Sequence, residues 1–304
     1  MLDLMIPPIT AALLILSIHA YLGLHVIARE VIFVDLAFAQ IAAMGATAAI
    51  LFGFEHGTPQ SLVFSLVFTL AGALVFSLTR MEKSSVPQEA IIGITFVVAS
   101  AAVILLAGFT AEGTEHLQET MTGTLIWVDW GTIGPLAVVY ALMGVFHFAL
   151  RKQFLVVSFE PEAATRIRFW DFLFYASFGL IISFSVEIAG VLMVFSTLVI
   201  PAVVAFLFTN RLGVALVLAW ISGAIAIVGG VGASFIWDVA TGPLLVCAFG
   251  IVLVLAAILR AVLGIRPEGK IAVKALARHE EAGHPAHHPE AAAAGVPLNR
   301  SEAS

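Results

Sequence analysis

The feature that most constrains this chain is a succession of apolar runs, each long enough to cross a lipid bilayer. About 20 apolar residues in an α-helix span a hydrocarbon core of about 30 Å. Runs of about that length lie at 6–27, 31–54, 60–79, 90–109, 132–150, 171–186, 189–208, 213–236 and 243–262. We therefore expect an all-α polytopic membrane protein with about nine transmembrane helices, a count of eight or ten being the alternatives.

The composition excludes an ordinary soluble domain. Hydrophobic residues make up 61% of the 304 residues, charged residues only 11%, and the mean hydropathy is +1.07, whereas roughly a quarter of residues are charged in soluble domains. The one cysteine, Cys247, allows no intramolecular disulfide and no cysteine-cluster zinc site. Because the basic residues form short, separated clusters, we expect the lipid bilayer and not nucleic acid as a partner.

The basic residues provide an independent check on the topology. In the nine-span arrangement all 14 lysines and arginines fall on one side of the membrane: Arg29, Arg80, Lys83, Arg151, Lys152, Arg166, Arg168, Arg211, Arg260, Arg266, Lys270, Lys274, Arg278 and Arg300. The opposite loops contain only acidic charges: Asp3, Glu55, Glu112, Glu115, Glu119, Asp129, Glu187 and Asp238. The positive-inside rule then predicts an external N-terminus and a cytoplasmic C-terminus.

The chain divides by composition into a transmembrane domain, residues 1–265, and a polar tail, residues 266–304. Rich in Ala, Pro, His and Glu, the tail is expected to be disordered and cytoplasmic. It contains four histidines among carboxylates: His279, His284, His287 and His288. These side chains could bind zinc, nickel or manganese, although His-rich tails also occur without any metal role.

The loop at 151–171 lies on the basic side and is the candidate docking element for a cytoplasmic partner. Its sequence from Ser158 to Arg166 is able to begin a short helix. In that interpretation Ser158 is the N-cap, and Pro161 and the acidic residues occupy the first turn. Asp171, just beyond the loop, and Glu187 lie at helix ends where solvent is expected to reach them.

Ionisable side chains are rare within the spans, so each one is a candidate functional residue. A charge near the middle of the bilayer costs roughly 2.5–3.5 kcal/mol. Asp35 lies one turn into the second expected span, and Gln40 and Met44 follow it on a shared helix face. On a regular helix Asp35 is about 140° from Gln40, so a common ion site would need a local bulge. The alternative is that Asp35 caps or pairs near the interface and Gln40 bonds a neighbouring helix.

The sequence contains no convincing energy-coupling or catalytic motif. The segment from Gly264 to Ile271 has the glycine and lysine spacing of a phosphate-binding loop, but Ile271 replaces the hydroxyl that would hold magnesium and Pro267 restricts the loop. His-Glu-x-x-His is also absent. Transport against a gradient would therefore draw on an ion gradient or on a separate ATPase.

Four segments, taken in chain order, carry motifs that resemble one family. They are Arg29-Glu-Val-Ile-Phe-Val-Asp35-Leu-Ala-Phe-Ala-Gln40 with Gly45, Val157-Ser-Phe-Glu-Pro-Glu-Ala-Ala164, Ala189-Gly-Val-Leu-Met-Val-Phe-Ser-Thr-Leu-Val-Ile-Pro201-Ala202, and Gly230-Val-Gly-Ala-Ser234 with Asp238 and Ala240-Thr-Gly242. Together they resemble the permease subunits of bacterial zinc, manganese and iron ABC importers of the ABC-3 type. The resemblance covers roughly residues 22–258.

This resemblance implies a type II importer in the bacterial inner membrane. It implies a permease homodimer, a cytoplasmic ATP-binding subunit that uses the ATP, an extracytoplasmic metal-binding protein, and a divalent metal, zinc or manganese foremost, that is transported and not a bound cofactor. The alternatives are a cobalamin or siderophore permease of the related branch and a secondary metal transporter.

The resemblance also assigns roles to residues. The ATPase-coupling loop would comprise Ser158, Phe159, Glu160, Pro161, Glu162, Ala164 and Arg166. Asp35 matches the family's pathway aspartate, and Gln40 and Met44 would line the same pathway at the dimer interface. The histidine that follows the aspartate by four residues in the family has no counterpart, because Ala39 occupies that position and Gln40 comes one residue later. The identity of the metal therefore stays open.

Overall fold

The computed structural model describes residues 2–55, 58–80, 86–109 and 121–265, and the regular elements within these ranges are all helical. Nine of the described helices are long and apolar enough to span a membrane. They are α1 (Leu2–Ala28), α2 (Val34–Leu51), α3 (Pro59–Thr79), α4 (Gln88–Ala107), α6 (Trp130–Ala149), α8 (Ile167–Ala189), α9 (Val191–Phe208), α10 (Leu212–Trp237) and α11 (Thr241–Leu263). The prediction of an all-α chain with about nine spans is confirmed.

Three short helices complete the described elements. They are η1 (Leu125–Trp127), α7 (Arg151–Phe159) and η2 (Pro161–Ala163). All of the described helices belong to one compact unit, Met1–Ala272. The tail histidines His279, His284, His287 and His288 lie outside the described residues.

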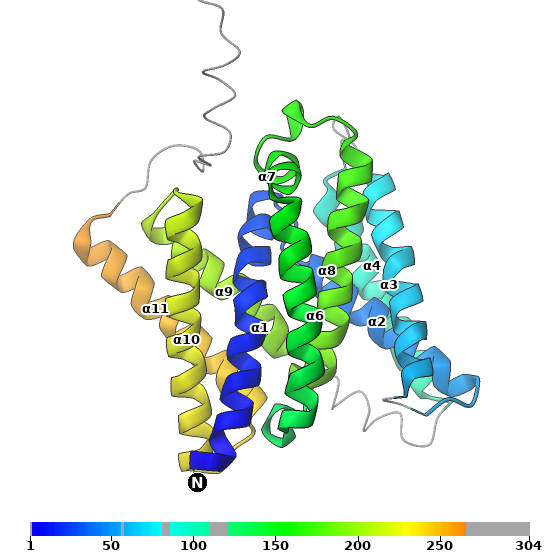
Figure 1. Ribbon diagram of the computed structural model, residues 1–304, viewed down its shortest axis with the longest axis horizontal. Coiled ribbons are helices and arrows are strands. Elements are labelled where there is room, and N and C mark those ends of the chain that lie inside the picture. The colour runs from blue at the N-terminus through cyan, green and yellow to red at the C-terminus, as the bar shows by residue number, and fades with distance from the viewer. Residues whose placement is uncertain (1, 56–57, 81–85, 110–120, 266–304) are drawn as a thin grey trace, which may run out of the picture. The chain divides into compact units, whose positions relative to one another are not determined.

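The spanning helices pack in two groups (Figure 1). One group consists of α1, α9, α10 and α11, and the other of α2, α3, α4 and α8. Contacts of α8 and α2 with α9 join the two groups, and α6 lies against α1 and α8. The long apolar side chains of α4 and α11 that face outward, such as Val97, Ile104 and Leu255, are exposed in the isolated chain. Such faces are suited to contact lipid, because they present no polar group to the hydrocarbon core.

Aromatic side chains fill the centre of the second helix group. Phe38 of α2 meets Phe76 of α3 edge to face, with ring centroids 5.2 Å apart, and both rings contact Tyr175 of α8. Phe178, one turn further along α8, also packs on Phe38. Aromatic pairs in this geometry add about 0.5–1.5 kcal/mol each beyond the area they bury. The cluster fixes α8 against α2 and α3, and thereby positions the charged residues at the start of α8.

The turn between α8 and α9 is even shorter, and lies later in the chain, than the gap at residues 187–188 that the expected spans left. Gly190 alone separates the two helices and has a φ of +76°. Its backbone packs against Gly123, so closely that a Cβ on Gly190 would lie 2.4 Å from the Gly123 nitrogen. Nearby, the Thr124 N–H donates to the Ile188 carbonyl at 3.1 Å. The segment before η1 therefore packs its backbone directly on this turn, which only glycine permits.

We expect Gly190→Ala to lower the free energy of unfolding markedly. A non-glycine residue forced into such a conformation costs about 1–3 kcal/mol, and the clash with Gly123 adds to that. The matched control is Gly53→Ala, because Gly53 has a φ of +84° but no heavy atom within 4 Å of its added Cβ. Thermal unfolding in detergent should show only the cost of the strained φ for the control and a clearly larger loss for Gly190→Ala. Equal losses would contradict the role of the close contact.

The turn between α10 and α11 contains the last of the four sequence motifs. The Ser234 hydroxyl donates to the Val239 carbonyl at 2.7 Å and bonds the Thr241 hydroxyl at 2.7 Å. Asp238 ends α10 in the left-handed conformation. A Cβ on Gly242 would lie 2.3 Å from the Thr122 carbonyl oxygen. This motif therefore shapes a tight helical hairpin.

The start of α6 is capped by an acidic side chain. Asp129 accepts hydrogen bonds from the Thr132 N–H at 2.9 Å and from the Thr132 hydroxyl at 2.8 Å. The Thr132 N–H, with its hydroxyl, holds the pKa of the Asp129 carboxyl below its ordinary value. The cap marks the end of the connection from η1 and sets where the span begins.

Candidate functional site

Asp35 is enclosed within the described part of the chain. The residue is 1% exposed, and its Oδ1 atom accepts a hydrogen bond from the Leu36 N–H at 2.8 Å. Its Oδ2 atom is buried without a hydrogen-bond partner among the described residues. The sequence indicated that Asp35 lies one turn inside the span. The helix begins at Val34, however, so Asp35 lies in the first turn of α2. A buried carboxylate oxygen without a partner is costly, and such a group calls for a functional explanation.

Gln40 and Met44 occupy a different face of α2 from Asp35. The helix runs without interruption from Val34 to Leu51, so the bulge needed to bring Asp35 and Gln40 to one ion is not formed in it. Gln40 is 3% exposed and Met44 is half-buried. With about 1.5 Å of rise per residue, Asp35 and Gln40 are about 7–8 Å apart along the helix axis. The three residues therefore lie at successive levels of α2.

A second carboxylate, which the sequence analysis missed, lies beside the start of α2. Glu89 of α4 accepts a hydrogen bond from the Phe33 N–H at 3.1 Å, and its Oε2 atom is buried without a partner among the described residues. Glu89 is close enough to Asp35 for their charges to interact. An acidic residue at the start of the fourth span, on the same side as Asp35, was the available sequence signal.

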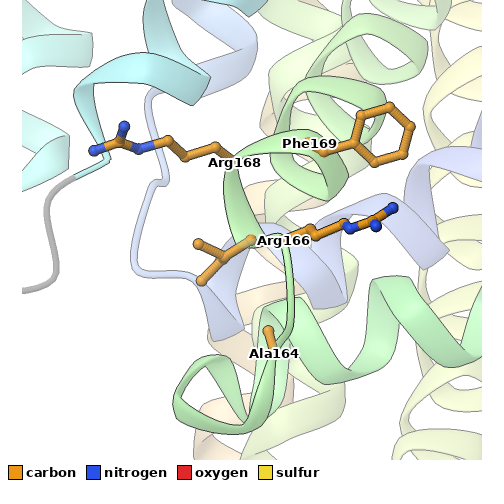
Figure 2. Close-up of a pocket in the computed structure, with 5 residues that line it drawn as sticks. Ala164, Arg166, Arg168 and Phe169 are labelled. Atoms are coloured by element: carbon orange, nitrogen blue, oxygen red, sulfur yellow. The ribbon is translucent and has the colours of Figure 1, made fainter.

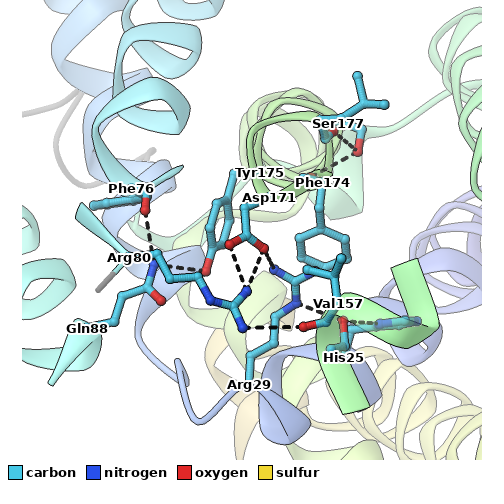
Figure 3. A network of polar contacts seen from close by, with 12 residues as sticks. His25, Arg29, Phe76, Arg80, Gln88, Val157, Asp171, Phe174, Tyr175 and Ser177 are labelled. Carbon is cyan, nitrogen blue, oxygen red and sulfur yellow. Dashed lines mark hydrogen bonds and ion pairs between the residues drawn. The ribbon is translucent and has the colours of Figure 1, made fainter. Parts of the chain in front are cut away.

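A network of charged side chains joins the ends of α1 and α3 to the start of α8 (Figure 3). Asp171 of α8, 0% exposed, accepts hydrogen bonds from Arg29 Nη1 at 2.7 Å, and from Arg80 Nη1 at 2.7 Å to each carboxylate oxygen. Arg29 follows α1 and Arg80 follows α3. The expectation that solvent reaches Asp171 is wrong, because two guanidinium groups enclose it. Glu187, at the other end of α8, is exposed as expected.

Aromatic rings support the buried Arg29. Its guanidinium lies 3.8 Å from the centroid of the Phe174 ring and 5.5 Å from that of Tyr175. Stacking of this kind suits arginine, whose planar cation is weakly hydrated. Arg29 Nη2 nevertheless has no hydrogen-bond partner among the described residues.

Ser158 belongs to this network and does not cap a helix. It lies in the last turn of α7, where it is 4% exposed. Its hydroxyl accepts from Arg29 Nε at 2.8 Å and bonds His25 Nδ1 at 2.8 Å. The predicted cap is wrong, because Ser158 lies inside α7 (Arg151–Phe159), and the helix that begins at Pro161 is only the three-residue η2, preceded by Glu160. The side chain therefore points into the protein.

The rest of the loop presents a mixed charged surface. Glu160, Glu162 and Arg166 are exposed, whereas Phe159, Pro161 and Ala164 are half-buried. A hollow at the start of α8 is lined by Ala164, Arg166, Ile167, Arg168 and Phe169, and Figure 2 shows the two arginines pointing away from each other. Of the residues assigned to the coupling loop, the exposed ones are available to a partner and Ser158 is not.

The described residues contain no group of three or more His, Cys, Asp or Glu side chains that could hold a metal ion. The carboxylates of Asp35 and Glu89 are the acidic groups with buried, unpartnered oxygens in this part of the chain.

In the described part of the chain, nine apolar helices with outward-facing apolar surfaces, and a buried network of charged side chains around Asp171, define a multi-pass helical membrane protein. The chain belongs to the ABC 3 transport family, which matches residues 1–260. It is the membrane-spanning permease subunit of an ABC transporter, and a transporter rather than an enzyme. The family resemblance inferred from the motifs is confirmed, and the alternative of a secondary transporter is excluded.

Individual relatives agree with this assignment. The manganese transport system membrane protein MntC of Listeria monocytogenes is 29% identical over 197 residues, which cover 62% of this chain and 68% of MntC. The chelated iron transport system membrane protein YfeD of Yersinia pestis is 25% identical over 181 residues, covering 58% of this chain and 61% of YfeD. The solved structure of PsaBC from Streptococcus pneumoniae in complex with Fab has the same fold, with a TM-score of 0.68 at 20% identity over 82% of this chain and 89% of that chain.

Proposed function

We propose that this chain is the permease of an importer for a divalent metal ion, with manganese as the preferred cargo. The observation that carries the proposal is the buried Asp35 carboxylate, whose Oδ2 atom has no partner among the described residues, within a chain of the ABC 3 transport family. A passing cation would supply the missing interaction. The names of the relatives, manganese and chelated iron transport proteins, favour the metal branch over a cobalamin-type permease.

The donor atoms favour manganese over zinc. Asp35 offers a carboxylate and Gln40 a neutral amide oxygen, whereas Met44 adds only a thioether. Carboxylate and carbonyl oxygens suit manganese, and imidazole and thiolate suit zinc. Because the three residues lie at successive levels of α2, we propose that they act as successive contacts along the pathway and not as one ligand set. Since Asp35 and Gln40 are nearly covered in the single chain, the ion would meet them when the surrounding helices separate.

The partners and orientation complete the proposal. The chain would form a homodimer, bind a cytoplasmic ATP-hydrolysing subunit through the exposed part of the loop after α7, and receive metal from an external binding protein. From the distribution of basic residues we propose that this loop and the C-terminus lie in the cytoplasm of a bacterium and the N-terminus lies outside. Residues 266–304 would then form a cytoplasmic tail whose histidines bind metal after passage.

The proposal is tested by total cellular metal content. Cells expressing the full chain with its ATPase and binding protein are compared, by mass spectrometry, with cells whose ATPase cannot hydrolyse ATP. A rise in manganese that depends on ATP hydrolysis supports the proposal. A rise in another metal alone would refute the manganese assignment, and no change in any metal would refute the importer.

We expect Gln40→His to shift the metal preference toward zinc, because imidazole replaces a neutral oxygen at this level of the pathway. The ratio of zinc uptake to manganese uptake should rise by about tenfold or more. Gln40→Asn keeps an amide oxygen and serves as the control, in which the ratio should stay near that of the wild type. Competition between labelled manganese and zinc measures it, and an unchanged ratio in Gln40→His would remove Gln40 from the pathway.

A further inference from the structure

The loop that follows α6 is divided into an outer and an inner part. The outer part holds the exposed charges Glu160, Glu162 and Arg166. The inner part, the buried face of α7, includes Phe154, Leu155, Val157 and Ser158. A partner on the outer part can therefore act on the spanning helices only through what the inner part contacts.

Polar contacts of the inner part lead to two arginines. The Ser158 hydroxyl accepts from Arg29 Nε at 2.8 Å, and the Val157 carbonyl accepts from Arg80 Nη2 at 3.4 Å. These arginines follow different helices, α1 and α3, in the chain. Each one therefore ties α7 to the end of a separate spanning helix.

Both arginines are held by the same carboxylate. Asp171 Oδ1 accepts from Arg29 and from Arg80 at 2.7 Å in each case, so α1, α3, α7 and α8 meet at one group of side chains (Figure 3). We name Arg29, Arg80, Ser158 and Asp171 the loop clamp. A displacement of α7 cannot leave the geometry of these bonds unchanged, because every donor of the clamp is shared between two elements.

The charges of the clamp suit a link whose bonds can change partner. Its two guanidinium groups face one carboxylate, and Arg29 Nη2 is buried without a partner among the described residues. Buried ion pairs are weak contributors to stability relative to apolar packing. The Arg80 side chain is 16% exposed, whereas that of Arg29 is 2% exposed. Arg80 is thus the member of the clamp that can release its bonds toward solvent.

We propose that the loop clamp couples ATP hydrolysis by the partner subunit to movement of α1, α3 and α8, with Ser158, Arg29 and Arg80 as positioning residues. The inference rests on the proposed importer function. In this proposal the outer part of the loop binds the ATPase. The clamp converts the displacement of α7 into displacement of α1, after which the chain continues to Asp35, and of α3, which packs against α2. Packing of α2 against α3 and α8 provides the remaining mechanical connection.

The test measures manganese transported per ATP hydrolysed. The full chain, in complex with its ATPase, is reconstituted in proteoliposomes with Mn²⁺ as the probe. The variants Ser158→Ala and Arg80→Gln each remove one link from α7 to a spanning helix without touching the exposed loop surface. Their controls are Ser17→Ala, whose hydroxyl donates within its own helix to Leu14, and Arg211→Gln, which removes an exposed arginine from the same side.

We expect each clamp variant to transport at least about tenfold less Mn²⁺ per ATP, while ATP hydrolysis and co-purification of the ATPase stay within about twofold of the wild type. The controls should keep the wild-type ratio. An unchanged ratio in both clamp variants would overturn the inference, and so would a loss of uptake that merely follows lost ATPase binding. Failure of the wild-type complex to move Mn²⁺ would instead overturn the proposed function and, with it, the clamp.

Discussion

Replacing Asp35 by asparagine is expected to reduce manganese uptake by at least about 100-fold. The substitution keeps the size of the side chain and keeps an oxygen for the Leu36 N–H, so the local structure should persist. It removes the negative charge and the Oδ2 atom, which is the buried acceptor without a partner among the described residues. Loss of an outer-shell partner alone weakens metal sites by about 10–100-fold, and loss of a direct ligand should exceed that range.

Uptake of radioactive manganese by cells, at matched amounts of permease and bound ATPase, measures this effect. Glu187→Gln is the control, because it removes one negative charge from an exposed position near the end of α8, outside α2. If Asp35→Asn transported as well as this control, the carboxylate would be a structural group at the start of α2 and the pathway would lie elsewhere.

Replacing Asp171 by asparagine is expected to cause the largest loss of stability. The carboxylate is fully buried and balances two guanidinium groups, of which Arg29 is itself 2% exposed. Removing one partner of a buried ion pair costs about 3–5 kcal/mol, because the remaining charges stay buried. The melting temperature in detergent should fall by roughly 10 °C.

Asp238→Asn provides the matched control for this measurement. Asp238 is exposed at the turn between α10 and α11, in a left-handed conformation that asparagine tolerates well. Surface substitutions of this kind change stability by about 0.5 kcal/mol or less. A similar melting temperature for Asp171→Asn and the control would mean that the arginines find other partners, and the clamp would then have no unique anchor.

The spans were predictable because crossing a membrane depends on local composition. Each helix must satisfy the hydrogen bonds of its own backbone and present apolar side chains to lipid. Both requirements depend on consecutive residues, so they can be recognised in the sequence. A tight connection before α9 was also expected, because the spans 171–186 and 189–208 left only two residues between them, although the structure places the turn at Gly190. That the basic residues share one side of the membrane stays a prediction from the same count of spans.

The role of Ser158 and the burial of Asp171 could not be predicted in this way. Ser158 bonds Arg29 across 129 positions of sequence, and Asp171 bonds Arg29 across 142 and Arg80 across 91. The local sequence pattern predicted that Ser158 caps a helix and that Asp171 lies at a solvent-accessible helix end. These residues are joined only because the residues that follow α1 and α3 meet at the start of α8 and the end of α7.

The all-helical membrane fold, a count of about nine spans and the family could be inferred from the sequence, because hydropathy, charge and short motifs act over neighbouring residues. The meeting points of the charged groups became visible only in the folded chain, where Glu89 lies beside the start of α2 and helices α1, α3, α7 and α8 are joined around Asp171. The physical reason is that burial and hydrogen bonding inside a bundle depend on which helix faces come together, and helices far apart in the chain make those contacts.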